Sequence, residues 1–104
     1  MSDAFVAVLR IDLHFPDAGS LKAKRRDLQS VKAQLQGRMG VAVAEVAHHD
    51  AWQRSTLAAA VVAGSAGRAA DHADRVEEWL LSRFPETVSV QRALASWTDL
   101  AGLG

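Results

Sequence analysis

The chain has no cysteine, no excess of either charge and no long apolar run. Without cysteine there can be no disulfide, no thiolate nucleophile and no cysteine-based zinc site. Twelve basic residues balance twelve acidic ones, so the net positive charge of a typical nucleic-acid-binding domain is absent. No segment approaches the roughly 18 apolar residues of a membrane span, and the N-terminus lacks a signal-peptide pattern. We therefore expect a cytoplasmic protein with no membrane contact.

Catalytic motifs are also missing from the sequence. It has no glycine-rich phosphate loop, no nucleophile elbow and no paired-histidine motif on a helix. Ser55 and Thr56 follow His48 closely, but no third group is available to orient them as a nucleophile and base. We predict a protein that is not an enzyme and that needs no cofactor.

The residues that are present describe one small folded domain. Hydrophobic residues make up 49% of the 104 positions and charged residues 23%, a balance typical of folded globular chains. We predict a single domain over residues 1–97. Residues 98–104 contain two glycines and offer no packing partner, so we expect a flexible C-terminal tail.

Hydrophobic periodicity divides the domain into six segments. Alternation with a period of two indicates strands, whereas apolar residues three and four apart indicate helices. In order, the segments are strand 5–15, helix 20–37, strand 41–47, strand 54–63, helix 68–83 and strand 87–97. This βαββαβ order predicts an α+β, ferredoxin-like fold, with two helices on one face of a four-stranded antiparallel sheet.

A cationic cluster begins the first helix. In the predicted fold, this helix start shares one edge of the sheet with the end of the first strand and with the turn between the second and third strands. Cations oppose the helix dipole at that position, but cations and free helix amides together suit phosphate. The candidate anion or RNA ligands are Ser20, Lys22, Lys24, Arg25, Arg26, His14, His48, Trp52 and Arg54. The alternative is a solvated helix surface that binds nothing.

Two residues near this edge have more than one interpretation. Trp52 either covers the end of the sheet or forms an exposed stacking platform, and we favour the cover because tryptophan usually buries its large area. Glu45 is expected to form a cross-strand ion pair with Arg54. Alternatively, Glu45 orients Arg54 toward a ligand.

Histidines also gather at the edge but do not predict a metal site. His48, His49 and Asp50 adjoin one another, and His14 is expected nearby. Adjacent histidines on extended backbone point to opposite sides, so they cannot both converge with His14.

The sheet face that the helices leave open is small and apolar. It is predicted to carry Val6, Val8, Ala58, Ala60 and Val62. Because no aromatic residue lies on this face, base stacking of the kind seen in RNA-recognition motifs is excluded. An apolar patch of this kind often marks an interface with another protein or with a second copy of the chain.

Three sequence blocks resemble the YlxP-like family of small bacterial proteins. They are Ser20-Leu21-Lys22-Ala23-Lys24-Arg25-Arg26, Val43-Ala44-Glu45-Val46 and Trp52-Gln53-Arg54, and their order and spacing match over most of the first 65 residues. The resemblance implies a bacterial cytosolic protein of unknown function with a ferredoxin-like fold, often encoded near genes for translation initiation and ribosome maturation.

Residues and resemblance together give one expected function and one alternative. The expected function is a small binding protein whose basic edge contacts RNA backbone, with ribosomal RNA or a ribosome-associated protein as partner. The alternative is a protein-interaction or homodimerisation domain that uses the open sheet face and binds no nucleic acid.

Overall fold

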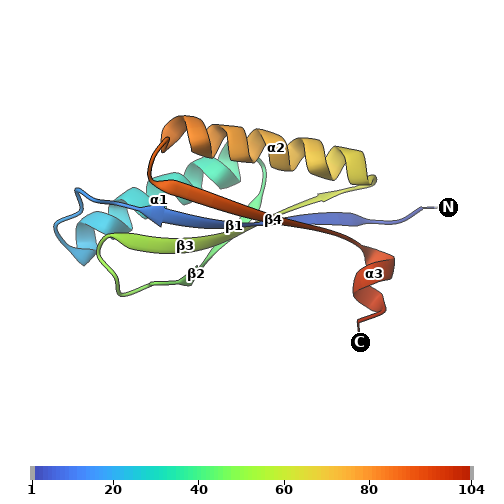
Figure 1. Cartoon of the computed structure of the whole chain (residues 1–104), viewed down its shortest axis with the longest axis horizontal. Coiled ribbons are helices and arrows are strands. Elements are labelled where there is room, and N and C mark those ends of the chain that lie inside the picture. The colour runs from blue at the N-terminus through green and yellow to red at the C-terminus, as the bar shows by residue number, and fades with distance from the viewer. Residues whose placement is uncertain (1, 104) are drawn as a thin grey trace.

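The computed structural model describes residues 2–103 and has the predicted order of elements. The elements are β1 Phe5–His14, α1 Leu21–Gly37, β2 Ala42–Ala47, β3 Arg54–Ala63, α2 Ala66–Arg83, β4 Val88–Ser96 and α3 Trp97–Ala101. All strand pairs are antiparallel and the strand order is β2-β3-β1-β4. Helices α1 and α2 cover the same face of the sheet (Figure 1). The ferredoxin-like prediction is therefore confirmed.

Alternate residues of the central strands form the core. In β1, Leu9, Ile11 and Leu13 are at most 3% exposed and face the helices. Leu35 of α1 and Leu80 of α2 are fully buried against this layer. Burial of each such side chain stabilises the fold by roughly 1.5–3 kcal/mol. The regular alternation in the sequence was therefore a sufficient signal for β1.

Both ends of α1 have a local cause. At the start, the Ser20 hydroxyl accepts a hydrogen bond from the Ala23 amide at 3.1 Å, as expected of an N-cap. At the end, the helix reaches Gly37, and Gly40 then adopts a positive φ of 66° that turns the chain into β2. The Ser20 cap thus sets the first residue of the helix, and the turn at Gly40 sets where the chain enters β2.

The C-terminal segment differs from the flexible tail expected at 98–104. Trp97–Ala101 form the short helix α3, which begins with a capping box between Ser96 and Asp99. The Trp97 amide donates to the Ala4 carbonyl at 2.7 Å, which ties α3 to the start of β1. A short helix thus stands where no element was expected, because Ser96 and Asp99 cap it, and the flexibility of residues 98–104 stays a prediction. Residue 104 lies outside the described residues.

The molecule is long and narrow. Its extents are 52, 29 and 21 Å, and its Cα radius of gyration is 14.8 Å, above the roughly 13 Å of a compact chain of this length. Helix α3 lies on the opposite side of the sheet from α1 and α2, at the end where β1 begins (Figure 1). Within residues 2–103, no helix has the length and apolar character needed to cross a membrane.

Candidate functional site: a polar edge and an open apolar face

Three segments meet at one end of the sheet, as the fold predicts. The Phe15 amide donates to the Gln53 carbonyl at 2.8 Å, and the Gln53 side-chain amide donates to the Pro16 carbonyl at 3.1 Å. On the other side of the turn, Lys24 Nζ donates to the His48 carbonyl at 2.8 Å. The turn between β2 and β3 is therefore attached both to the end of β1 and to the start of α1.

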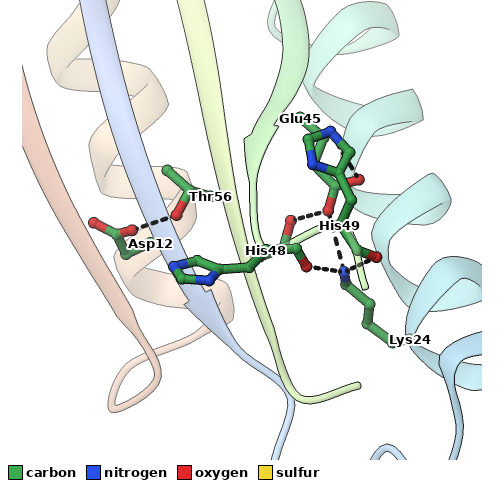
Figure 2. A network of polar contacts seen from close by, with 7 residues as sticks. Asp12, Lys24, Glu45, His48, His49 and Thr56 are labelled. Atoms are coloured by element: carbon green, nitrogen blue, oxygen red, sulfur yellow. Dashed lines mark hydrogen bonds and ion pairs between the residues drawn. The ribbon is translucent and has the colours of Figure 1, made fainter. Parts of the chain in front are cut away.

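Lys24 is an internal cation and not a surface ligand. Its side chain is fully buried, and Nζ lies 3.1 Å from Glu45 Oε2, 2.8 Å from the His48 carbonyl and 3.2 Å from the His49 carbonyl (Figure 2). These three acceptors use all three ammonium donors. The prediction that Lys24 contacts an external anion was wrong, because the residue lies on the core-facing stripe of α1 with Leu28 and Leu35.

Glu45, whose side chain is 16% exposed, is the anion that pairs with the buried Lys24. Burial raises the pKa of its carboxyl, but the Ser55 hydroxyl, which donates to Oε2 at 2.6 Å, and the Lys24 ammonium outweigh that effect and hold the pKa below its ordinary value. The expected pair with Arg54 was wrong. Glu45 is opposite Leu57 on the helix-covered face, whereas Arg54 is opposite His14, whose side chain belongs to the open face.

The histidines of the edge do not converge. His48 has a positive φ of 63°, a conformation that few side chains adopt, and its carbonyl is one of the two that accept hydrogen bonds from Lys24. His49 Nε2 lies 3.9 Å from Glu45 Oε1, and its side chain is 59% exposed. His14 is paired in register with Arg54. In the described part of the chain, no three metal-ligating side chains come together.

The cations that remain free surround this edge. Lys22, Arg25, Arg26 and Arg54 are exposed, and within residues 2–103 none of them forms an ion pair shorter than 4.0 Å. Lys24 is neutralised by Glu45 inside the molecule. The accessible positive charge therefore comes from its sequence neighbours in α1 and from Arg54 at the start of β3.

Trp52 is 57% exposed in the turn. The cover that we favoured was therefore wrong. The turn is held by Lys24 and Gln53 through backbone carbonyls, so the indole is not needed to close the end of the sheet. The indole is exposed, and its use as a stacking platform stays a prediction.

A polar hollow of about 280 Å³ lies beside the edge, between the end of β1 and the start of β4. Asp12, His14, Arg54 and Glu86 contribute charges of both signs to its wall. Asp12 accepts a 2.6 Å hydrogen bond from the buried Thr56 hydroxyl (Figure 2).

The apolar half of the open face has the predicted residues in register. Val6 pairs with Val62 and Val8 with Ala60 across β1 and β3, and Ala58 follows opposite Arg10. Val62 is 72% exposed and Val8 40%. The predicted placement of these five residues is confirmed, and the valines are accessible to a partner.

The Lys24–Glu45 pair is the feature that sequence reasoning missed. Lys24 precedes Leu28, Val31 and Leu35 at helical spacing, so it occupies a core position of α1. Glu45 follows Val43 in the inward phase of β2. A cation and an anion that both stand at inward positions of neighbouring elements could have signalled a buried pair.

Comparison with known proteins places the chain in a family. The model of a family described as "Protein of unknown function (DUF503)" matches residues 6–92. The chain belongs to the DUF503 family. The "Uncharacterized protein YlxP" of Bacillus subtilis is similar, with 36% identity over 70 residues that cover 67% of this chain and 75% of that protein. The resemblance to YlxP-like proteins is thus confirmed.

Solved structures share the fold of this DUF503 protein at low sequence identity. A de novo designed protein, Foldit4, is 11% identical with a TM-score of 0.55, and the match covers 88% of this chain and 96% of that one. A VAO-type flavoprotein from Myceliophthora thermophila is 16% identical with a TM-score of 0.51, covering 98% of this chain but only 20% of the flavoprotein. Both similarities concern the fold alone.

Proposed function

We propose that this DUF503 protein is a non-enzymatic binding module that contacts single-stranded RNA backbone through its basic edge. The observation that carries the proposal is a set of exposed cations without an ion-pair partner among residues 2–103, on the first turns of α1 and at the start of β3, together with an exposed tryptophan in the turn that Lys24 attaches to α1. We call Lys22, Arg25, Arg26, Trp52 and Arg54 the RNA-contact group. The YlxP-like resemblance, with its link to ribosome maturation, favours ribosomal RNA as the partner in a bacterial cell.

The buried pair supports this proposal by holding the group in shape. Lys24 attaches the turn that carries Trp52 to the helix that carries Lys22 and Arg25. The turn and the start of α1 therefore form one connected framework, from which the exposed side chains extend. A preformed arrangement loses less conformational entropy when a ligand binds.

Trp52 adds a contact that phosphate binding alone does not provide. An exposed indole can stack on any base, and such stacking is worth roughly 1–3 kcal/mol per base and tolerates any sequence. With cations beside it, the turn can hold a base while the helix start contacts the neighbouring phosphates. We therefore expect binding that depends on salt and discriminates little between sequences.

Fluorescence anisotropy of a labelled single-stranded RNA, titrated at several salt concentrations, tests the proposal. Four phosphate contacts predict a slope of about −3 in a plot of log affinity against log salt. Reversing Lys22, Arg25 and Arg26 to glutamate should flatten the slope by about 2. These reversals favour the helix dipole, so the fold should tolerate them. Trp52→Ala should weaken binding about tenfold.

The matched control changes the net charge equally at positions away from the edge. Arg38, Arg68 and Arg75 are also exposed, and their reversal to glutamate should leave most of the affinity in place. Equal losses in the two triple variants would show unspecific attraction and contradict the proposed site. Absence of any binding at low salt would contradict the function itself.

A further inference from the structure

The open face has a hollow in its middle. Val8, Ala42, Ala44, Ala58 and Ala60 come from three neighbouring strands and line a volume of about 240 Å³. The hollow exists because short side chains stand at adjacent register positions, where Ala42 is opposite Ala60 and Ala44 is opposite Ala58. Its wall is almost entirely apolar, so water gains little by filling it.

The same side of the molecule has an apolar projection at one end. Helix α3 lies on the side of the sheet away from α1 and α2 (Figure 1). On it, Trp97 is 66% exposed and Leu100 43%. Together with Val6 and Val62 they line a second hollow of about 150 Å³. An exposed tryptophan and leucine on a capped helix form a raised apolar surface that nothing within residues 2–103 covers.

Charges on this side are arranged in a complementary way. Arg10 is exposed opposite Ala58, at the border of the central hollow, and within the described residues it has no ion-pair partner. The projection is acidic. Asp99 lies in α3, and Asp3 accepts a 2.9 Å hydrogen bond from the Thr98 hydroxyl. The hollow therefore has a cation, Arg10, at its border, whereas α3 has two anions, Asp3 and Asp99, beside it.

We infer that two copies of the chain associate through their open faces, with α3 of each copy seated in the central hollow of the other. A two-fold axis that lies in the plane of the interface, parallel to the sheet, makes both contacts at once, because in an isologous dimer the projection of each copy meets the hollow of the other. In this arrangement, Asp3 and Asp99 of one copy face Arg10 of the other.

We infer that a second copy of the chain fills the central hollow, because each chain carries both the hollow and the apolar helix α3 that fits it. A different partner would have to supply its own projection and acids, whereas the copy already has them. The formal net charge of zero gives no long-range repulsion between copies.

Sedimentation equilibrium of the full chain over a micromolar range tests the dimer. The monomer mass is 11.2 kDa, and we expect the mass to double with rising concentration. Trp97→Ala and Val62→Lys each change an exposed side chain, so the fold should persist, and each should shift the dissociation constant by at least tenfold. Arg10→Glu should weaken association most at low salt. Leu81→Ala removes an exposed apolar side chain from α2, on the other side of the sheet, and as the control it should leave the dissociation constant of the dimer unchanged.

Cysteine crosslinking tests the geometry independently, because the chain has no cysteine of its own. A mixture of the Leu100→Cys and Ala44→Cys variants should form a mixed disulfide on mild oxidation. A mixture of Trp52→Cys and Ala44→Cys should not. A monomer at every concentration, or a dimer that the Trp97 and Val62 variants leave intact and that gives no mixed disulfide, would overturn the inference.

Discussion

At the scale of single residues, the unusual feature is a fully buried lysine in the apolar stripe of α1. A cation in that position is tolerated only because Glu45 and two backbone carbonyls receive its three hydrogen bonds. Its role is therefore to connect the helix start to the β2–β3 turn. A basic cluster in a sequence can therefore include a buried cation. In α1, the helical spacing of Lys24 from Leu28, Val31 and Leu35 distinguishes it from its exposed neighbours.

We expect Lys24→Met to destabilise the fold by about 3 kcal/mol, since it leaves Glu45 without its cation and two carbonyls without a donor. The Lys24→Met and Glu45→Leu double variant should be more stable than Lys24→Met alone, because the unpaired carboxylate is gone. Urea denaturation measures both. Lys22→Met, at an exposed position, should change the stability by less than about 0.5 kcal/mol. Equal effects of Lys22→Met and Lys24→Met would show that Lys24 is not buried.

At the scale of elements, the ends of the helices decide where functional residues lie. Ser20 starts α1 at the position that keeps Lys22 and Arg25 exposed, and Gly40 turns the chain so that β2 enters beside β3. The capping box at Ser96 starts α3, and Trp97 lines a hollow together with Val6 and Val62 of the open face. Short local signals therefore position both proposed contact surfaces.

Two glycines near the end of α1 should respond to alanine substitution in opposite ways, so that each variant is the control for the other. Gly40→Ala meets no atom within 4 Å, so its cost is that of the positive φ of 66° alone, and we expect a loss of about 1 kcal/mol. Gly37→Ala also meets open space, but it lies in the helix, so it should stabilise the fold by about 0.5 kcal/mol. Thermal unfolding of the two variants should thus shift in opposite directions. A shift of the same sign would contradict the assigned turn.

At the scale of the whole molecule, the two proposed contacts lie at different ends of a long body. The RNA-contact group surrounds the β2–β3 turn, whereas α3 adjoins the start of β1 (Figure 1). Variants at one end can therefore be tested for effects at the other, and additive behaviour is expected for such distant positions.

Acid stability of the molecule should depend on Glu45. Its pKa in the folded chain is lowered from the ordinary 4.5, so its stabilising effect is complete above that value, and it is lost as the pH falls through the lower, folded pKa. We expect Glu45→Gln to be less stable than the wild type at neutral pH and to lose less stability between about pH 4.5 and more acidic conditions. Urea midpoints across this range measure the difference. Parallel pH profiles of the two proteins would refute the prediction.

The sequence alone determined the fold class. Alternation in β1, the caps of α1 and the breaks at Pro16 and Pro85 are local signals, and they sufficed for the order of elements because each reports the environment of its own segment. The same alternation correctly placed Val6, Val8 and Val62 on the open face. The cations Lys22, Arg25 and Arg26 lie in the first turns of α1, where the sequence predicted them.

Only the tertiary structure decided which of the charges are available. Lys24 and Glu45 are 21 positions apart, and whether they neutralise each other depends on how a helix packs on a sheet, which no local pattern contains. The exposure of Trp52 follows from the same packing, since Lys24 and Gln53 already hold the turn. The position of α3 on the open side likewise depends on the pairing of β1 with β4, because that pairing places Trp97 beside Val6 and Val62.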